Sequence, residues 1–363
     1  MIGSHTATTR SYLSQFARVQ SPSDRKAKLW VYERGARPFS ATPYRVGKEN
    51  GYFAVTKADG GRDESMEATL AALESRGAAL LPLLNYETYV ISPQDEDDLS
   101  GYIALTFART TARRSLGAMI LGHIREAYKE LASDPEWLQE QASAYEAFSG
   151  VATSLEGIST AASKVLAKLS KPEFVNNAFV QGLLQVADAI RADLKDKPWQ
   201  IWEAPGQAQF VTTDNPLITL KREMQGFLPG CGFGTPGVTS VFAISPSCCF
   251  VTGGGIGPGR RYWRRATSKD VNSVNRALVM CMDRWAYSAT PSEDIEWLVN
   301  RFGGIVKYGV NAFVPTWMNN ASEHIKAKIR GVIAPHLAKI GPRSASWPAG
   351  AEMKLDSSAQ KAT

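Results

Sequence analysis

Apolar residues recur at three- and four-residue steps through the middle of the chain, from about residue 63 to residue 195. This spacing places them on one face of a helix, so the pattern predicts a helical middle region. The clearest stretch is 173–194, whose apolar positions are Phe179, Leu183, Val186, Ile190 and Leu194. Further helices are expected at 134–148 and 152–169.

A helix start is predicted near residue 92. Ser92 and Pro93 precede four consecutive acidic residues at 95–98. Acidic side chains are favourable in the first turn because they face the positive end of the helix dipole. We therefore expect a helix that begins at Pro93 and leads to Arg109 and Arg113.

The pattern changes after Pro198, where short runs of β-branched and aromatic residues lie between Gly and Pro turns. We expect strands at 199–202, 209–213, 238–244 and 248–252, with an earlier strand at 28–33. Outside the helical middle region, further helices are expected at 8–19, 268–289, 293–303 and 319–330.

These elements predict an α+β fold, with a helical middle region packed on a mostly antiparallel sheet. We expect a single domain over residues 1–340. Within it, the helical insertion occupies about 63–195 and the strand-rich part about 198–252. Residues 341–363 are rich in Ser, Ala and Lys and have little to bury, so we expect a disordered tail.

Charge and cysteine content narrow the class of protein. The 363 residues include 41 Lys and Arg against 35 Asp and Glu, a formal charge of +6. This mild basicity permits a polyanionic partner without requiring one. The chain has neither a secretory signal pattern nor an apolar run of membrane-spanning length. Four cysteines without C-x-x-C spacing indicate reduced thiols, and we expect a cytoplasmic protein.

Residues 210–217 form the most informative stretch, a short strand pattern that leads into Asp214, Asn215 and Pro216. Such a turn holds a carboxylate and an amide at the end of a rigid element, where a functional site is easily preorganised. The alternative is an ordinary turn in which the Asp side chain caps its own backbone.

Three further residues suit the chemistry of an anionic substrate. Arg109 and Arg113 lie four positions apart, so they share a helix face and can clamp a phosphate or carboxylate. His5, near Arg10, has the side chain best suited to proton transfer near neutral pH. The alternatives are a structural ion pair for the arginines and an ordinary surface position for His5.

A glycine-rich segment at 252–259 precedes a basic run interleaved with aromatic residues. Arginines beside aromatic side chains suit nucleic acid, because cations contact phosphates while bases stack on rings. The candidates for nucleic-acid binding are Arg260, Arg261, Trp263, Arg264 and Arg265. The glycines match neither a Walker loop nor a dinucleotide fingerprint, and a hairpin loop with a solvated basic edge is the alternative.

These pieces, in this order, resemble the family called domain of unknown function 4238. The matching residues are His5, Arg10, Tyr12, Leu13, Phe16, 30–33, Arg109, Thr110, Arg113, 210–216 and Asn275. Two prolines of the family pattern are replaced here, by Thr9 and Thr111. The resemblance implies that His5 belongs to the protein and is not a cloning remnant, and it implies no particular reaction.

The leading hypothesis is a metal-independent nuclease or other enzyme that processes a phosphodiester or nucleotide, without a cofactor. His5 would be the general acid or base, and Arg10, Arg109 and Arg113 would stabilise phosphoryl charge. Asp214 would orient His5 or hold the substrate, and Asn215 would donate a hydrogen bond. A toxin or phage-defence effector fits this reading.

Two other hypotheses need no catalysis. One is a binding protein whose arginines line a pocket for an anionic ligand. In the other, His5, Arg109 and Asp214 belong to a buried network that pins the N-terminal segment to the core.

Overall fold

The computed structural model describes residues 4–6, 10–18, 26–46, 48–50, 53–57, 59–63, 65–223, 226–229, 232–233, 235–253 and 261–306, with single positions at 327 and 331. The predicted helix at 319–330, apart from residue 327, and the tail at 341–363 lie outside these residues.

The structure confirms an α+β fold. A six-stranded sheet has the order β10-β9-β11-β12-β7-β13, and only its last pair, β7 with β13, is parallel. Its strands are β7 (Trp199–Glu203), β9 (Leu217–Glu223), β10 (Gly226–Pro229), β11 (Val238–Ala243), β12 (Cys248–Gly253) and β13 (Arg261–Arg265). Every residue of β12 is buried, as expected for a central strand covered on both faces.

A second sheet is smaller and fully antiparallel, with the order β3-β2-β14-β8. It consists of β2 (Leu29–Glu33), β3 (Phe39–Ala41), β8 (Thr212–Thr213) and β14 (Trp285–Ser288). The described residues also form two short antiparallel strand pairs: β1 (Ser4–Thr6) with β4 (Lys48–Asn50), and β5 (Val55–Thr56) with β6 (Arg62–Asp63).

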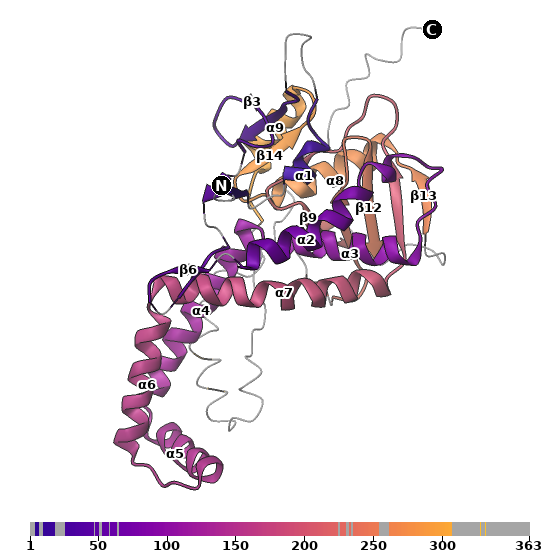
Figure 1. Ribbon diagram of the computed structural model, residues 1–363. Coiled ribbons are helices and arrows are strands. Elements are labelled where there is room, and N and C mark those ends of the chain that lie inside the picture. Colours follow the sequence, from indigo (N-terminus) through magenta and orange to yellow (C-terminus); the bar gives the residue numbers. More distant parts are fainter. Residues whose placement is uncertain are drawn as a thin grey trace, which may run out of the picture.

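The helical middle region is confirmed and has two parts (Figure 1). Helices α2 (Ser65–Leu80), α3 (Pro93–Ala108) and α7 (Pro172–Asp196) run side by side against the body that holds the sheets. Helices α4 (Thr111–Leu131), α5 (Pro135–Ser149) and α6 (Leu155–Leu169) extend away from it as an arm. A small apolar cluster around Leu131 and Trp137 gives the arm a core of its own.

The N-terminus of α3 forms as its sequence predicts. The Ser92 hydroxyl accepts the N–H of Asp95, and the Asp95 carboxylate accepts the N–H of Ser92, which is a complete capping box. Gly77 lets α2 approach α3 closely, because a Cβ there would lie 2.1 Å from the Cβ of Tyr102.

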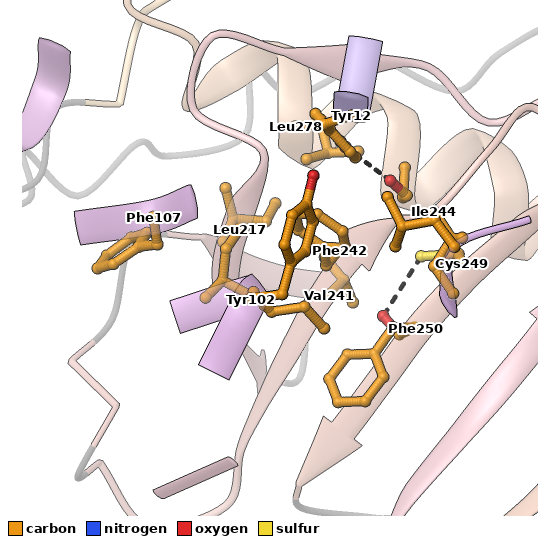
Figure 2. Close-up of a cluster of buried hydrophobic side chains, with 14 of the residues drawn as sticks. Tyr12, Tyr102, Phe107, Leu217, Val241, Phe242, Ile244, Cys249, Phe250 and Leu278 are labelled. Carbon is orange, nitrogen blue, oxygen red and sulfur yellow. Dashed lines mark hydrogen bonds between the residues drawn. The ribbon is translucent and has the colours of Figure 1, made fainter. Parts of the chain in front are cut away.

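The main core lies between α3, the short helix α1 (Arg10–Ser14) and the six-stranded sheet (Figure 2). Tyr102 and Phe107 of α3 pack with Leu217, Phe242 and Phe250 of the sheet. A further core lies between the four-stranded sheet and helices α8 (Ser268–Met280) and α9 (Glu293–Phe302).

The predicted helix at 268–289 is wrong in its last part. Helix α8 ends at Met280, and Trp285–Ser288 form strand β14, which pairs with β2 and β8. The helical spacing continued past this point, but the backbone N–H groups of residues 283–285 are held by the side chain of Asp214. Bonds from a distant segment therefore override the local pattern.

Candidate functional site

Asp214 stands directly after β8 and is 5% exposed. One of its carboxylate oxygens, Oδ1, accepts the backbone N–H of Asp283 at 2.8 Å. The other, Oδ2, accepts those of Arg284 at 2.7 Å and Trp285 at 2.9 Å. Burial raises the pKa of Asp214 to about 6, and the three donors oppose that rise. The carboxylate thus holds the turn between α8 and β14.

Asn215 and Asn275 fix the backbone on either side of Asp214. The Asn215 amide donates to the carbonyl of Cys281, at 2.9 Å, just after α8 ends. The Asn275 amide donates to the carbonyl of Gln209, and its oxygen accepts the N–H of Val211. Both asparagines are buried, and these side-chain hydrogen bonds go to main-chain groups.

Tyr12 joins the same segment to the large sheet. Its hydroxyl donates to the carbonyl of Ala243 at 2.6 Å and lies 2.6 Å from the hydroxyl of Thr212. These contacts connect α1, β8 and the end of β11 within the core shown in Figure 2. Burial keeps the pKa of Tyr12 well above its usual value.

Arg109 is 1% exposed and forms an ion pair with Glu74 of α2. Its guanidinium also lies 4.7 Å from the ring centre of Phe53. The guanidinium of Arg113 lies 3.8 Å from the ring centre of Phe107. The prediction that the two arginines share a helix face is wrong, because α3 ends at Ala108 with Arg109 as its C-cap and Arg113 lies in the first turn of α4.

A hydrogen-bond chain connects the arginine motif with the Asp214 turn. Thr111 follows Arg109 and Thr110 and starts α4, and its hydroxyl donates to Oδ2 of Asp283 at 2.8 Å. The backbone N–H of Asp283 donates in turn to Asp214. Two motifs about a hundred positions apart in the sequence therefore meet at the α8–β14 turn.

The open site adjoins this turn. A cleft of about 1150 Å³ lies between α1, β2 and the segment 39–46, and Trp285 forms part of its wall. Its charged lining residues in the described part of the chain are all basic, namely Arg10, Lys26, Lys28 and Arg45. Its aromatic lining residues are Phe39, Tyr44 and Trp285.

Arg10 is the predicted site residue that lines this cleft. Its guanidinium lies 5.7 Å from the ring centre of Tyr44. Arg10 and Arg45 are exposed and line the cleft, and neither forms an ion pair with a carboxylate of the described residues. Arginine suits phosphate because its planar guanidinium donates two parallel hydrogen bonds.

Sequence reasoning missed Lys26, Lys28, Tyr44 and Arg45. They are scattered over twenty residues without a motif, and only the folding of β2 and β3 beside α1 brings them together. The one available signal was the excess of basic residues between positions 10 and 48.

His5 lies in β1, where it pairs with Glu49 of β4. Its side chain is outside the described structure. The strand is followed closely by α1, which carries Arg10 into the cleft.

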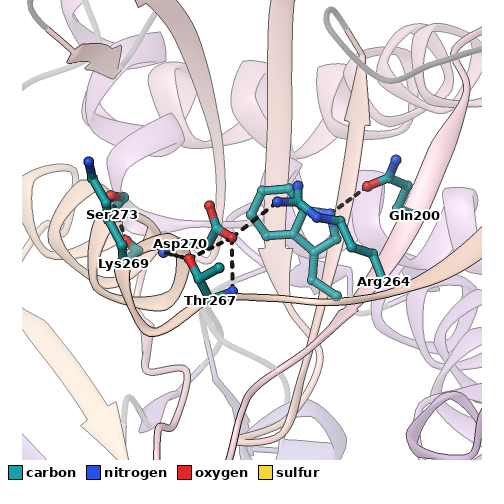
Figure 3. Close-up of polar contacts among 7 residues, drawn as sticks. Gln200, Arg264, Thr267, Lys269, Asp270 and Ser273 are labelled. Carbon is teal, nitrogen blue, oxygen red and sulfur yellow. Dashed lines mark hydrogen bonds and ion pairs between the residues drawn. The ribbon is translucent and has the colours of Figure 1, made fainter.

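The predicted nucleic-acid-binding run falls on β13, one of the two edge strands of the large sheet. Arg260 lies outside the described residues, and of Arg261 only the backbone is described. Trp263 is partly buried against the core. Arg264 pairs with Asp270 at 3.2 Å and lies over the ring of Trp202 at 4.6 Å (Figure 3).

Arg265 is highly exposed and lies 3.7 Å from Glu203. The charges of Arg264 and Arg265 are thus partly offset by neighbouring carboxylates, and their contact with solvent leaves them accessible. The glycine-rich segment that precedes them lies beyond the described residues from position 254 to position 260.

In the described part of the chain, no three His, Cys, Asp or Glu side chains gather in the way a metal ion requires. None of the helices in this part of the chain combines the length and apolarity needed to cross a bilayer.

A family model described as protein of unknown function (DUF4238) matches residues 9–292. The chain belongs to the DUF4238 family. The matched region contains Arg10 and the rest of the cleft lining, the arm and the Asp214 turn, and His5 lies before it. No curated protein and no solved structure matches the chain.

Proposed function

We propose that this DUF4238 protein binds a nucleoside phosphate, free or as part of a single-stranded nucleic acid, in the basic cleft. The observation that carries the proposal is the lining of the cleft, in which four basic side chains stand beside three aromatic ones. Cations neutralise phosphates, and aromatic rings stack on bases, so this combination suits a nucleotide better than a simple anion.

Asp214, Arg109 and Asn215 do not line the cleft. Asp214 holds the N–H of Trp285, whose side chain forms part of the wall. Arg109 and Asn215 are buried and engaged with protein groups. We therefore assign them positioning roles in this proposal.

Hydrolysis of the bound phosphodiester is the enzymatic form of the proposal. His5 would act as general acid or base, and Arg10 would stabilise the developing phosphoryl charge. The short connection from β1 to α1 ties these two residues to one N-terminal segment. In this form the protein would act as a nuclease, with toxin or phage-defence roles as its biological setting.

Calorimetric titration with nucleoside mono-, di- and triphosphates and with short single-stranded RNA and DNA tests ligand binding. Arg10→Ala and Arg45→Ala should each weaken binding by about tenfold, because each loses a charge-assisted hydrogen bond to phosphate. Lys164→Ala removes an exposed charge on the arm and should bind like the wild type. Equal affinity of all four proteins for every ligand would overturn the proposal.

Incubation with the ligands that bind tests catalysis. His5→Ala should abolish cleavage while it retains binding, because a general acid or base acts on the reaction step. Cleavage at the wild-type rate in His5→Ala would exclude the mechanism. Binding without turnover in the wild type would leave a non-catalytic nucleotide-binding protein.

A further inference from the structure

The end of the arm carries an exposed apolar surface. Phe148, near the end of α5, is 93% exposed, and Tyr145, Val151 and Leu155 are exposed as well. Tyr145 and Phe148 stand three positions apart, so they share one face of α5. An apolar group gathered at one extremity is typical of an interaction surface. We call residues 145–155 the arm tip.

The sequence segment that contains the arm tip is acidic. Between positions 130 and 160 the chain has six acidic residues and no basic one. The acidic residues are Glu130, Asp134, Glu136, Glu140, Glu146 and Glu156. Glu146 and Glu156 are exposed and lie within or next to the arm tip. A partner for this surface must therefore be basic and must also offer apolar contact.

The basic cleft has the complementary character. Its described charged residues are all basic, and Phe39, Tyr44 and Trp285 offer aromatic contact. In Figure 1 the arm end around α5 lies at the opposite extremity from α1 and β3, which border the cleft. The arm tip therefore cannot reach the cleft of its own molecule, whereas the tip of a second copy can.

We propose that the arm tip of one molecule docks in the basic cleft of a second copy. Phe148 would contact the aromatic wall, and Glu146 and Glu156 would face Arg10 and Arg45. The two surfaces differ, so the interface is heterologous and joins molecules head to tail. The inference rests on the proposed function because it uses the same cleft, and it makes nucleotide binding and self-association mutually exclusive.

Sedimentation velocity of the full chain tests the proposal across a concentration series at low and high salt. The wild type should associate as concentration rises, and both high salt and saturating nucleotide should dissociate it. Phe148→Ser and the double variant Glu146→Lys/Glu156→Lys should remain monomeric. Asp188→Lys reverses an exposed acidic charge on α7 and serves as the control that should associate normally.

A charge exchange identifies the two surfaces. Arg10→Glu/Arg45→Glu should be monomeric alone, and mixing it with Glu146→Lys/Glu156→Lys should restore complexes, because a basic tip then meets an acidic cleft. Circular dichroism confirms that each variant is folded. A monomeric wild type at every concentration would overturn the proposal, as would association that survives both tip variants or a mixture that stays monomeric.

The two proposals fail separately. Nucleotide affinity is measured in dilute solution, where Glu146→Lys/Glu156→Lys should match the wild type. Normal nucleotide binding by a strictly monomeric protein would refute self-association alone. Association that depends on the tip and the cleft, without any nucleotide affinity, would refute the proposed function alone.

Discussion

Asp214 and Trp285 are joined reciprocally. The N–H of Trp285 donates to Oδ2 of Asp214 at 2.9 Å, and the N–H of Asp214 donates to the carbonyl of Trp285 at 3.0 Å. The pair fixes the start of β14, and the side chain of Trp285 lines the cleft. A buried carboxylate is thereby connected to the wall of an open site without being exposed to a ligand.

Asp214→Ala should destabilise the protein by about 3–5 kcal/mol, because it leaves three part-buried backbone N–H groups without their acceptor. Urea denaturation measures the loss. Asp188→Ala, at an exposed position on α7, provides a control with little expected effect. A loss below about 1 kcal/mol in Asp214→Ala would show that the turn holds without the carboxylate.

The titration of Asp214 should make the stability of the wild type depend on pH. Burial raises the pKa of Asp214 to about 6, so the folded state binds this proton more tightly than the unfolded state. Stability from this group should therefore rise as pH falls from about 7 towards 4, by about 2–3 kcal/mol.

Asp214→Asn lacks the titrating group and serves as the reference for this dependence. The unfolding free energy of the wild type minus that of Asp214→Asn should increase as pH falls over that range. Urea denaturation at a series of pH values measures this difference. A decrease of this quantity on acidification would place the folded-state pKa of Asp214 below its unfolded value.

Tyr12→Phe should destabilise the protein by about 1–3 kcal/mol without removing the ring, because the buried carbonyl of Ala243 loses its donor. Thermal and chemical denaturation measure the effect. Tyr44→Phe is the matched control, since the side chain of Tyr44 is largely exposed. Equal losses in the two variants would contradict the role assigned to the Tyr12 hydroxyl.

Glu74→Leu should cost about 3–5 kcal/mol, because it removes the carboxylate that forms an ion pair with the buried guanidinium of Arg109. Replacing both residues, as Glu74→Leu/Arg109→Met, should recover part of that loss, since both charges of this ion pair are then removed together. A double-mutant cycle by denaturation measures the coupling. Simple additivity of the two single losses would show that the pair does not interact.

Arg264→Ala/Arg265→Ala tests the predicted nucleic-acid-binding run. Removal of two phosphate contacts should lower the slope of log affinity against log salt for single-stranded nucleic acid by about 1.4. The affinity for a mononucleotide, which occupies the cleft alone, should remain unchanged. An unaltered salt slope would restrict nucleic-acid contact to the cleft.

Local patterns determined much of the fold. The helix at 173–194 was predictable because its apolar residues follow one face, and it corresponds to α7. The start of α3 was predictable because Ser92 and Asp95 form a complete capping box within four residues. Residue chemistry indicated a special turn at residues 210–217. There the side chains of Asn275, Asp214 and Asn215 form long-range hydrogen bonds with backbone groups, and Tyr12 bonds to the hydroxyl of Thr212.

Tertiary structure decided what no local pattern encodes. Trp285 follows a helical pattern yet lies in a strand, because Asp214 holds its backbone from some seventy positions away. The sequence indicated Arg109 as part of a phosphate clamp, but in the folded protein its guanidinium forms an ion pair with Glu74 in the core. Arg10 and Arg45 share a cleft only because α1 and the segment after β3 fold together. Hydrogen bonds and ion pairs join residues that are far apart in the sequence. Local patterns therefore predicted most of the elements, whereas packing decided the exceptions and determined which residues are buried and which line the cleft.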